Sequence, residues 1–231
     1  MKVNQRKIIL SVLVFIVAFG ITFFVARRAM EFYYANLYRN AIILNQDKET
    51  IVVQENTALV NGVKSVKNSV FYIKSSTGKV LGSGIVLTQD GLAVTALNNL
   101  KTSNVSIILN GSEAQYEIKK RDTASGLALL SLKSNDKLST VGFADSEELD
   151  FGERVYMISY TDTGAPFITV NEGIIKNFNN GNVKTNIFEP EAVDGSPIFS
   201  IDNRLMGVGQ KDSKGFISLI SVARIRALSG L

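Results

Sequence analysis

Short apolar runs separated by turn residues occupy the chain from about residue 69 to its carboxyl end. The runs are rich in Val, Ile, Leu and Phe, and Gly, Asn and Asp stand between them. About a dozen short strands at close spacing, with no long helix between them, are typical of an all-β sandwich or barrel. The pattern therefore predicts an all-β domain, with a short helix before it at 57–67 and another at 221–228.

The amino-terminal segment departs from this β pattern. From Ile8 to Ala26 the chain is uncharged and mostly apolar. At ~1.5 Å per residue, a helix of this length approaches the ~30 Å hydrocarbon thickness of a bilayer. A single transmembrane helix is therefore predicted at 8–26, after a cytoplasmic tail at 1–7. A cleaved signal peptide is the alternative, but the run is long for one and lacks an Ala-x-Ala site.

Residues 27–56 separate this run from the β-rich region. The first part is free of Gly and Pro, so a juxtamembrane helical stalk or linker is predicted. Met30, Leu37, Leu44 and Ile51 recur every seven residues, so a helical association seam is the alternative interpretation. The globular domain is then predicted at 57–231.

The net charge of +4 suggests nucleic-acid binding at first sight. Five of the 25 basic residues flank the apolar run, and the remaining 20 face 21 acidic residues. The basic residues that flank the run are Lys2, Arg6, Lys7, Arg27 and Arg28. The charge thus belongs to the flanks of the run, and no nucleic-acid partner is expected.

Cysteine and histidine are both missing from the chain. With Cys 0, the chain has neither disulfides nor thiolate metal ligands. With His 0, it lacks the usual general base of serine and cysteine hydrolases. No cofactor and no metal site are predicted.

Four segments carry a further pattern of turn and apolar residues. In order they are 81–100 (LGSGIVLTQDGLAVTALNNL), 121–130 (RDTASGLALL), 142–155 (GFADSEELDFGERV) and 185–208 (TNIFEPEAVDGSPIFSIDNRLMGV). Their order and turn residues resemble those of the HtrA/Deg type of trypsin-like serine protease. The resemblance covers roughly 57–231 and implies a trypsin-like double β-barrel.

The resemblance aligns the three catalytic positions with residues that cannot perform their chemistry. The histidine position is Asn98, the aspartate position is Gly126 and the serine position is Asp194. A triad needs a base that accepts the proton of the nucleophile and a carboxylate that orients this base. The sequence therefore predicts a degenerate triad and a pseudoprotease. Asp194 is expected to be a structural turn residue hydrogen-bonded to Asn98.

A displaced nucleophile at Ser196 is the alternative to a lost catalytic site. Ser196 stands where the family has glycine, directly before Pro197, and no lysine lies near it in sequence. A turn role is therefore predicted, and a residual serine-type endopeptidase is the least favoured function.

The leading function is a protein- or peptide-binding or scaffolding module, and the alternative is a non-catalytic subunit that assembles with active relatives. The resemblance implies a peptide groove along Gln210, Lys211 and Asp212. It also implies homo- or hetero-trimers and a domain that is periplasmic or extracellular, with the amino terminus in the cytoplasm. The identity of the partner stays open.

Overall fold

The computed structural model describes residues 10, 13, 15–16, 18–35 and 57–231, except 103, 135–136, 146–148, 163–165 and 180–181. The chain divides into two compact units, Met1–Asn56 and Thr57–Leu231. Each unit is described separately.

The described part of the first unit contains a helix at 18–35. Among the residues that the structure describes, no helix is both long enough and apolar enough to cross a membrane. The prediction of a transmembrane helix at 8–26, with its membrane contact, is therefore wrong by this test. Within the predicted segment, residues 10, 13, 15–16 and 18–26 are described as helical. The helix continues through Arg27, Arg28 and Glu31, which form exposed ion pairs. Residues 8, 9, 11, 12, 14 and 17 of the predicted segment lie outside the described residues, as do 36–56 of the predicted stalk.

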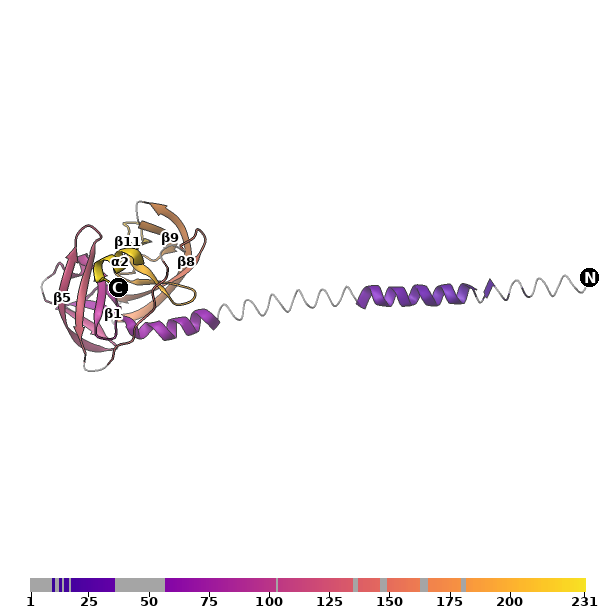
Figure 1. Cartoon of the computed structure of the whole chain (residues 1–231), viewed down its shortest axis with the longest axis horizontal. Helices are drawn as coiled ribbons and strands as arrows, with labels where there is room; N and C mark the ends of the chain where they lie inside the picture. Colours follow the sequence, from indigo (N-terminus) through magenta and orange to yellow (C-terminus); the bar gives the residue numbers. More distant parts are fainter. Residues whose placement is uncertain are drawn as a thin grey trace, which may run out of the picture. The chain divides into compact units, whose positions relative to one another are not determined.

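The predicted pair of β-barrels is present in the second unit (Figure 1). After a helix at 57–66, the elements are η1 (Lys67–Ser69), β1 (Val70–Ser75), β2 (Val80–Val86), β3 (Leu92–Ala96), η2 (Leu97–Leu100), β4 (Val105–Leu109), β5 (Ser112–Asp122), β6 (Leu127–Lys133), β7 (Arg154–Asp162), β8 (Pro166–Asn179), β9 (Asn182–Phe188), β10 (Pro197–Ser200), β11 (Leu205–Lys211), β12 (Phe216–Ser221) and α2 (Val222–Ser229).

The first barrel closes in the strand order β1-β2-β3-β6-β5-β4. Its interior is filled by apolar side chains that alternate along the strands, among them Ile73, Val86 and Leu130. Phe71 on β1 lies opposite Gly84 on β2, and a Cβ at Gly84 would lie 2.2 Å from the Phe71 ring. Glycine at this position therefore makes room for the aromatic ring.

The second barrel closes in the strand order β10-β11-β12-β9-β8-β7. Its longest strand, β8, pairs with β7 through 166–174 but with β9 only through 175–179. A register shift between Ile175 and Asn177 marks the beginning of the β9 ladder. The amino-terminal part of β8 thus has a strand partner on one side only.

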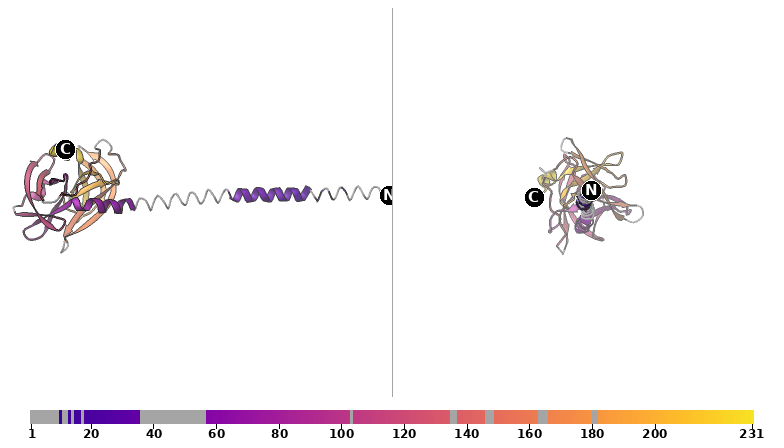
Figure 2. Two further views of the ribbon diagram at one scale, coloured as in Figure 1. Left: turned by 60° about the horizontal axis from the view of Figure 1, so that its bottom comes forward. Right: turned by 90° about the vertical axis from the view of Figure 1, so that its right-hand side faces the viewer.

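A third apolar core lies between the barrels, which pack side by side in all views (Figures 1 and 2). Val70 and Leu127 of the first barrel and Tyr156 and Phe199 of the second are buried in it. The rings of Tyr156 and Phe199 stack with centroids 5.2 Å apart. Burying each such large side chain contributes about 1.5–3 kcal/mol, so this core fixes how the facing loops of the two barrels meet.

Candidate functional site

The loop at 189–196 leaves the second barrel between β9 and β10 and docks on β2 of the first barrel. The backbone N–H of Ser83 donates to the carbonyl of Asp194 over 3.0 Å. Gly195 has φ +84°, and a Cβ there would lie 2.2 Å from the Ser83 carbonyl oxygen. Only glycine combines this left-handed backbone with so close an approach. The 189–196 loop is thus built to lie against the first barrel.

Asn99 ties the same loop to the first barrel through its side chain. Its Nδ2 donates to the carbonyl of Asp194 over 2.8 Å and to Oγ1 of Thr95 over 3.0 Å. Thr95 in turn donates to the Ser83 carbonyl over 2.6 Å. Asn99, Thr95 and Ser83 are all buried. A buried polar network of this kind is stable only when its members are hydrogen-bonded, as they are here.

The three positions aligned with the triad lie around the end of β11. The backbone N–H of Leu97, beside Asn98, donates to the carbonyl of Gly126 over 2.8 Å. A Cβ at Gly126 would lie 3.2 Å from Nε2 of Gln210 on β11. The next residue, Lys211, donates its backbone N–H to Oδ1 of Asp194 over 2.9 Å.

The expected hydrogen bond between Asp194 and Asn98 is wrong. Asn98 is exposed, and within the described part of the chain its side chain has no hydrogen-bond partner. The asparagine that reaches Asp194 is the neighbouring Asn99, and it binds the backbone carbonyl, not the carboxylate. The sequence analysis missed Asn99. The sequence alone does not distinguish it from the preceding Asn98.

The predicted groove strand at 210–212 is already engaged with the 189–196 loop. Gly209 donates to the carbonyl of Ser196 over 2.7 Å and accepts from the N–H of Gly195 over 2.8 Å. The Asp194 carboxylate continues this ladder one step further by accepting from Lys211. The ammonium group of Lys211 donates to the carbonyl of Pro190 over 2.6 Å. The loop therefore engages the backbone of Gly209 and the N–H of Lys211 at the end of β11.

The third groove residue, Asp212, begins the turn after β11. Its Oδ1 accepts from the backbone N–H groups of Lys214 over 2.8 Å and Phe216 over 3.0 Å. These hydrogen bonds, the one from Phe216 first, hold the pKa of the Asp212 carboxyl below its usual value. Its side chain is thus engaged in a local turn.

Backbone donors before Asp194 are also engaged within the protein. The N–H of Ala192 donates to the carbonyl of Glu189 over 3.1 Å. The N–H of Val193 donates to Oγ of Ser159 on β7 over 3.3 Å. Neither N–H is directed at a ligand in this arrangement.

Ser196 is fully buried. Its hydroxyl donates to the carbonyl of Val193 over 2.6 Å and lies 2.8 Å from Oγ of Ser159. Ser159 was also missed by the sequence analysis. Since a nucleophile must reach its substrate, the buried Ser196 hydroxyl is placed as a turn residue.

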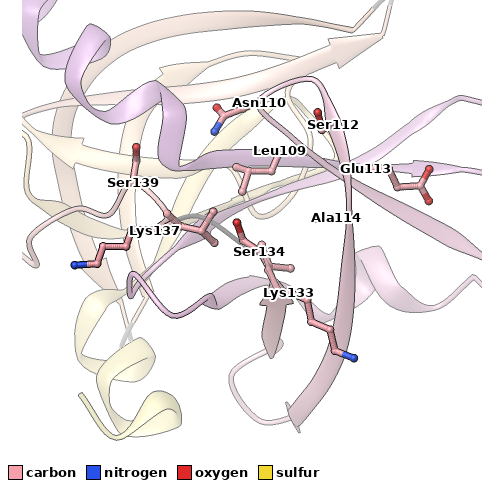
Figure 3. Close-up of a pocket in the computed structure, with 11 residues that line it drawn as sticks. Leu109, Asn110, Ser112, Glu113, Ala114, Lys133, Ser134, Lys137 and Ser139 are labelled. Carbon is pink, nitrogen blue, oxygen red and sulfur yellow. The ribbon is translucent and has the colours of Figure 1, made fainter.

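A pocket of about 300 Å³ lies at the end of the first barrel, near the β4–β5 turn. Figure 3 shows Lys133 and Lys137 at its rim with their ammonium groups directed away from each other. The remaining labelled side chains, Ser112, Ser134 and Ser139 among them, do not converge on one point (Figure 3). The pocket contains none of the residues aligned with the triad.

Comparison with known proteins connects this geometry to a family. The model of the trypsin-like peptidase domain matches residues 82–208, more than half of the chain. The chain is 30% identical over 146 residues to a probable periplasmic serine endoprotease, DegP-like, of Rickettsia conorii, a match that covers 55% of this chain and 28% of the relative. It is 28% identical over 154 residues to serine protease HTRA1A of Danio rerio, a match that covers 59% of this chain and 31% of the relative.

The chain thus spans about a third or less of the length of these relatives. The matched region begins within β2 and ends within β11, and it contains the 189–196 loop and all three positions aligned with the triad. Two closed barrels, with the loop between β9 and β10 set against the first, agree with the family match. The chain belongs to the trypsin-like peptidase family and is of the HtrA/Deg type.

Proposed function

We propose that this chain is an extracytoplasmic, non-cleaving member of its family that works by binding protein. The observation that carries the proposal is the state of Asp194, which is aligned with the catalytic serine. Its carboxylate accepts a hydrogen bond from the backbone of Lys211 and closes the loop onto β11. A residue in this state stabilises the loop and offers no nucleophile with a proton to transfer.

The surroundings of Asp194 support the same conclusion. Asn98, aligned with the histidine, cannot take up a proton near pH 7, and the chain contains no histidine at all. Gly126, aligned with the aspartate, faces the neutral amide of Gln210. Acyl transfer also needs free backbone donors for the developing oxyanion, and the N–H of Ala192 is bound to Glu189. Removing one nucleophile or base costs about a million-fold in turnover, so no measurable cleavage is expected.

The compartment follows from the relatives. The two Rickettsia relatives and the one from Rhizobium meliloti are described as probable periplasmic endoproteases. An extracytoplasmic domain without cysteine is compatible with this setting, because such domains need no disulfides when their cores are large. Two closed barrels with three apolar cores meet that condition.

A labelling and cleavage experiment tests the lack of activity. The full chain is incubated with a fluorophosphonate probe and, separately, with casein as an unstructured substrate, next to an active trypsin-like protease. We expect neither labelling nor cleavage from the chain. The matched variant is Ser196→Ala, which removes the one serine hydroxyl adjacent to the aligned nucleophile position. Labelling or cleavage that Ser196→Ala abolishes would overturn the proposal.

A second candidate is a non-catalytic subunit that assembles, as a trimer or otherwise, with active relatives. Exposed aromatic pairs on the second barrel favour it. Phe188 and Phe216 lie with ring centroids 5.2 Å apart, and Phe151 and Phe178 with centroids 4.9 Å apart. Apolar patches of this kind are frequent at protein interfaces. Crosslinking in the native host followed by purification distinguishes the two candidates, since recovery without any protease partner would exclude the second.

A further inference from the structure

The amino-terminal part of β8 carries a strand edge on which two residues, Ile168 and Val170, have no backbone hydrogen-bond partner among the described residues. β8 lies at the side of the domain opposite to β5 (Figure 1). From Pro166 to Ile174 it pairs with β7 in a continuous register without a bulge. Its other neighbour, β9, pairs only from residue 175 onward. One edge of this segment therefore lies beyond the β9 ladder.

The direction of the backbone groups on β8 follows from hydrogen bonds at its middle. Ile175 donates to the carbonyl of Glu153 and accepts from Gly152, so its backbone faces the β7 side. Ile174 donates instead to Oδ1 of Asn186 on β9, over 2.7 Å. Since successive residues of a strand direct their backbone groups to opposite sides, those of Ile168 and Val170 face away from β7.

Side chains close this edge only in part. Asn186 takes the N–H of Ile174, and Nδ2 of Asn171 donates to the carbonyl of Phe188 over 3.2 Å. Within the described part of the chain, no hydrogen bond reaches the outward backbone groups of Ile168 and Val170. Both side chains are exposed, at 38% and 42%. The open edge is thus defined as Phe167–Asn171.

Natural proteins protect such edges with charges, prolines or bulges, because an unpaired edge recruits another strand. The residues of the open edge provide none of these devices, since they are Phe, Ile, Thr, Val and Asn. The Glu189 carboxylate lies at its end, where Oε2 accepts from Nδ2 of Asn171 over 3.3 Å. Residues that disfavour pairing with another strand lie immediately outside the open edge. Pro166 precedes it, and Glu172, which is paired to Arg154, follows it. An uncharged edge of β-branched and aromatic residues is suited to pairing.

We propose that the open edge pairs with the same edge of a second copy of this chain. An antiparallel arrangement about a two-fold axis at Thr169 places Ile168 opposite Val170 of the partner. Because the outward backbone groups belong to these two residues, every one of them gains a partner in this register. The interface is isologous, as in most symmetric dimers.

The flanking residues support a second copy as the occupant. In this register Pro166 lies opposite Glu172 of the partner, so no like charges oppose each other. Proline lacks an N–H, so the ladder ends there on both sides. Inside the ladder, β-branched Ile168 and Val170 form cross-strand pairs of a favourable type. The self-complementarity comes from the sequence of the edge itself and does not depend on whether the chain cleaves peptides.

A single-cysteine variant tests the register directly. The full chain contains no cysteine, so Thr169→Cys introduces one thiol at the two-fold axis. Thr169 directs its backbone toward β7, so the two copies of residue 169 form a non-hydrogen-bonded pair with Cα atoms about 4.5 Å apart. That separation lies within the range of a disulfide. An interface of this small size is expected to be weak, so the oxidation is done at a high protein concentration of about 100 μM. Diamide is then expected to yield a covalent dimer.

The matched control is Gln115→Cys, which places a thiol on the exposed face of β5 in the first barrel. It should remain monomeric under the same oxidation. Equal crosslinking by Gln115→Cys would show that the dimer arises from collisions or from another part of the chain, and would overturn the proposal.

Two substitutions of Val170, to proline and to alanine, distinguish the contribution of backbone hydrogen bonds to the dimer from that of side-chain contacts. In the Thr169→Cys background, Val170→Pro removes an outward N–H without touching the β7 ladder. It should reduce the crosslinked fraction about tenfold, since each dimer loses two hydrogen bonds. Val170→Ala keeps the N–H and should retain most of the crosslink. A crosslink that is absent in Thr169→Cys itself, or that Val170→Pro leaves unchanged, would contradict the pairing.

Discussion

Two strand edges of the second barrel have the same kind of backbone and opposite surroundings. On β11, Gly209 and Lys211 direct their N–H groups to Ser196 and Asp194 of the 189–196 loop. On β8, the outward backbone groups of Ile168 and Val170 in the open edge have no hydrogen-bond partner among the described residues. The resemblance to active proteases predicted peptide pairing along Gln210–Asp212, and there the loop engages the backbone N–H and the ammonium group of Lys211.

The difference follows from the segments next to each edge. Beside β11, the connection between β9 and β10 is long enough to fold back, and Gly195 supplies the left-handed turn that it needs. Beside β8, the β9 ladder begins only at residue 175, after which a register shift bends the strand. The 189–196 loop can therefore pair with the edge of β11. The stagger of the strands in the barrel leaves the outward backbone groups of Ile168 and Val170 on β8 without a strand partner.

The largest expected effect concerns the turn that covers β11. Gly195→Ala adds a Cβ 2.2 Å from a backbone oxygen and 2.9 Å from Oγ1 of Thr95, at φ +84°. We expect a loss of about 3 kcal/mol or more in the free energy of unfolding, since neither the backbone nor Ser83 can yield easily. Urea denaturation measures it.

Gly111→Ala is the matched control for this turn. Gly111 has a similar φ of +80° but nothing within 4 Å of its added Cβ. Its loss should be only about 1–2 kcal/mol, the cost of the left-handed backbone alone. Equal losses in the two variants would show that the docking of the 189–196 loop on Ser83 contributes nothing to stability.

A smaller effect is expected when the carboxylate that ends the β11 ladder is removed. Asp194→Ala leaves the N–H of Lys211 without its acceptor and should cost about 1 kcal/mol. Amide exchange at Lys211 should accelerate about tenfold or more relative to Gly209, whose partner is backbone. Asp194→Asn keeps an acceptor oxygen and should exchange nearly as slowly as the wild type. An unchanged rate in Asp194→Ala would mean that the edge of β11 is closed by something else.

The smallest effect concerns the turn after β11 and its dependence on pH. The pKa of Asp212 is held below its usual value by hydrogen bonds from the N–H groups of Phe216 and Lys214. The folded state therefore binds fewer protons than the unfolded state around pH 3–4, and the contribution of Asp212 is lost as the pH falls below about 4. Asp212→Asn should lower stability slightly at pH 7 and reduce the further loss between pH 5 and 2. Parallel pH profiles for wild type and variant would contradict this role.

Most of the β architecture was predictable because its signals are local. Alternating apolar residues and turn glycines specify strands without reference to the rest of the chain. The transmembrane prediction relied on the length of an uncharged apolar run. It is overturned because, among the described residues, no helix is both long enough and apolar enough to cross a membrane.

The candidate site depends on contacts that local sequence patterns do not predict. The sequence contains Asn98 and Asn99 side by side, and nothing in it says which of the two is turned inward. In the structure the short helix η2 buries Asn99 and exposes Asn98, so Asn99 holds the 189–196 loop. The engagement of Lys211 with Asp194 and Pro190 was equally invisible, because it joins residues 17 and 21 positions apart through a fold of the loop.

The sequence alone determined the β-rich domain, the family resemblance that implies two barrels, and the residues at the three aligned positions, because these depend on periodicity, turn residues and their order. Only the tertiary structure decided which strand edge is occupied and which is bare. An edge becomes covered when a loop of the right length and conformation lies beside it, and this proximity arises from barrel stagger and from the packing between the barrels. The stagger and the packing between the barrels both join residues that are distant in sequence, so local sequence patterns do not predict them.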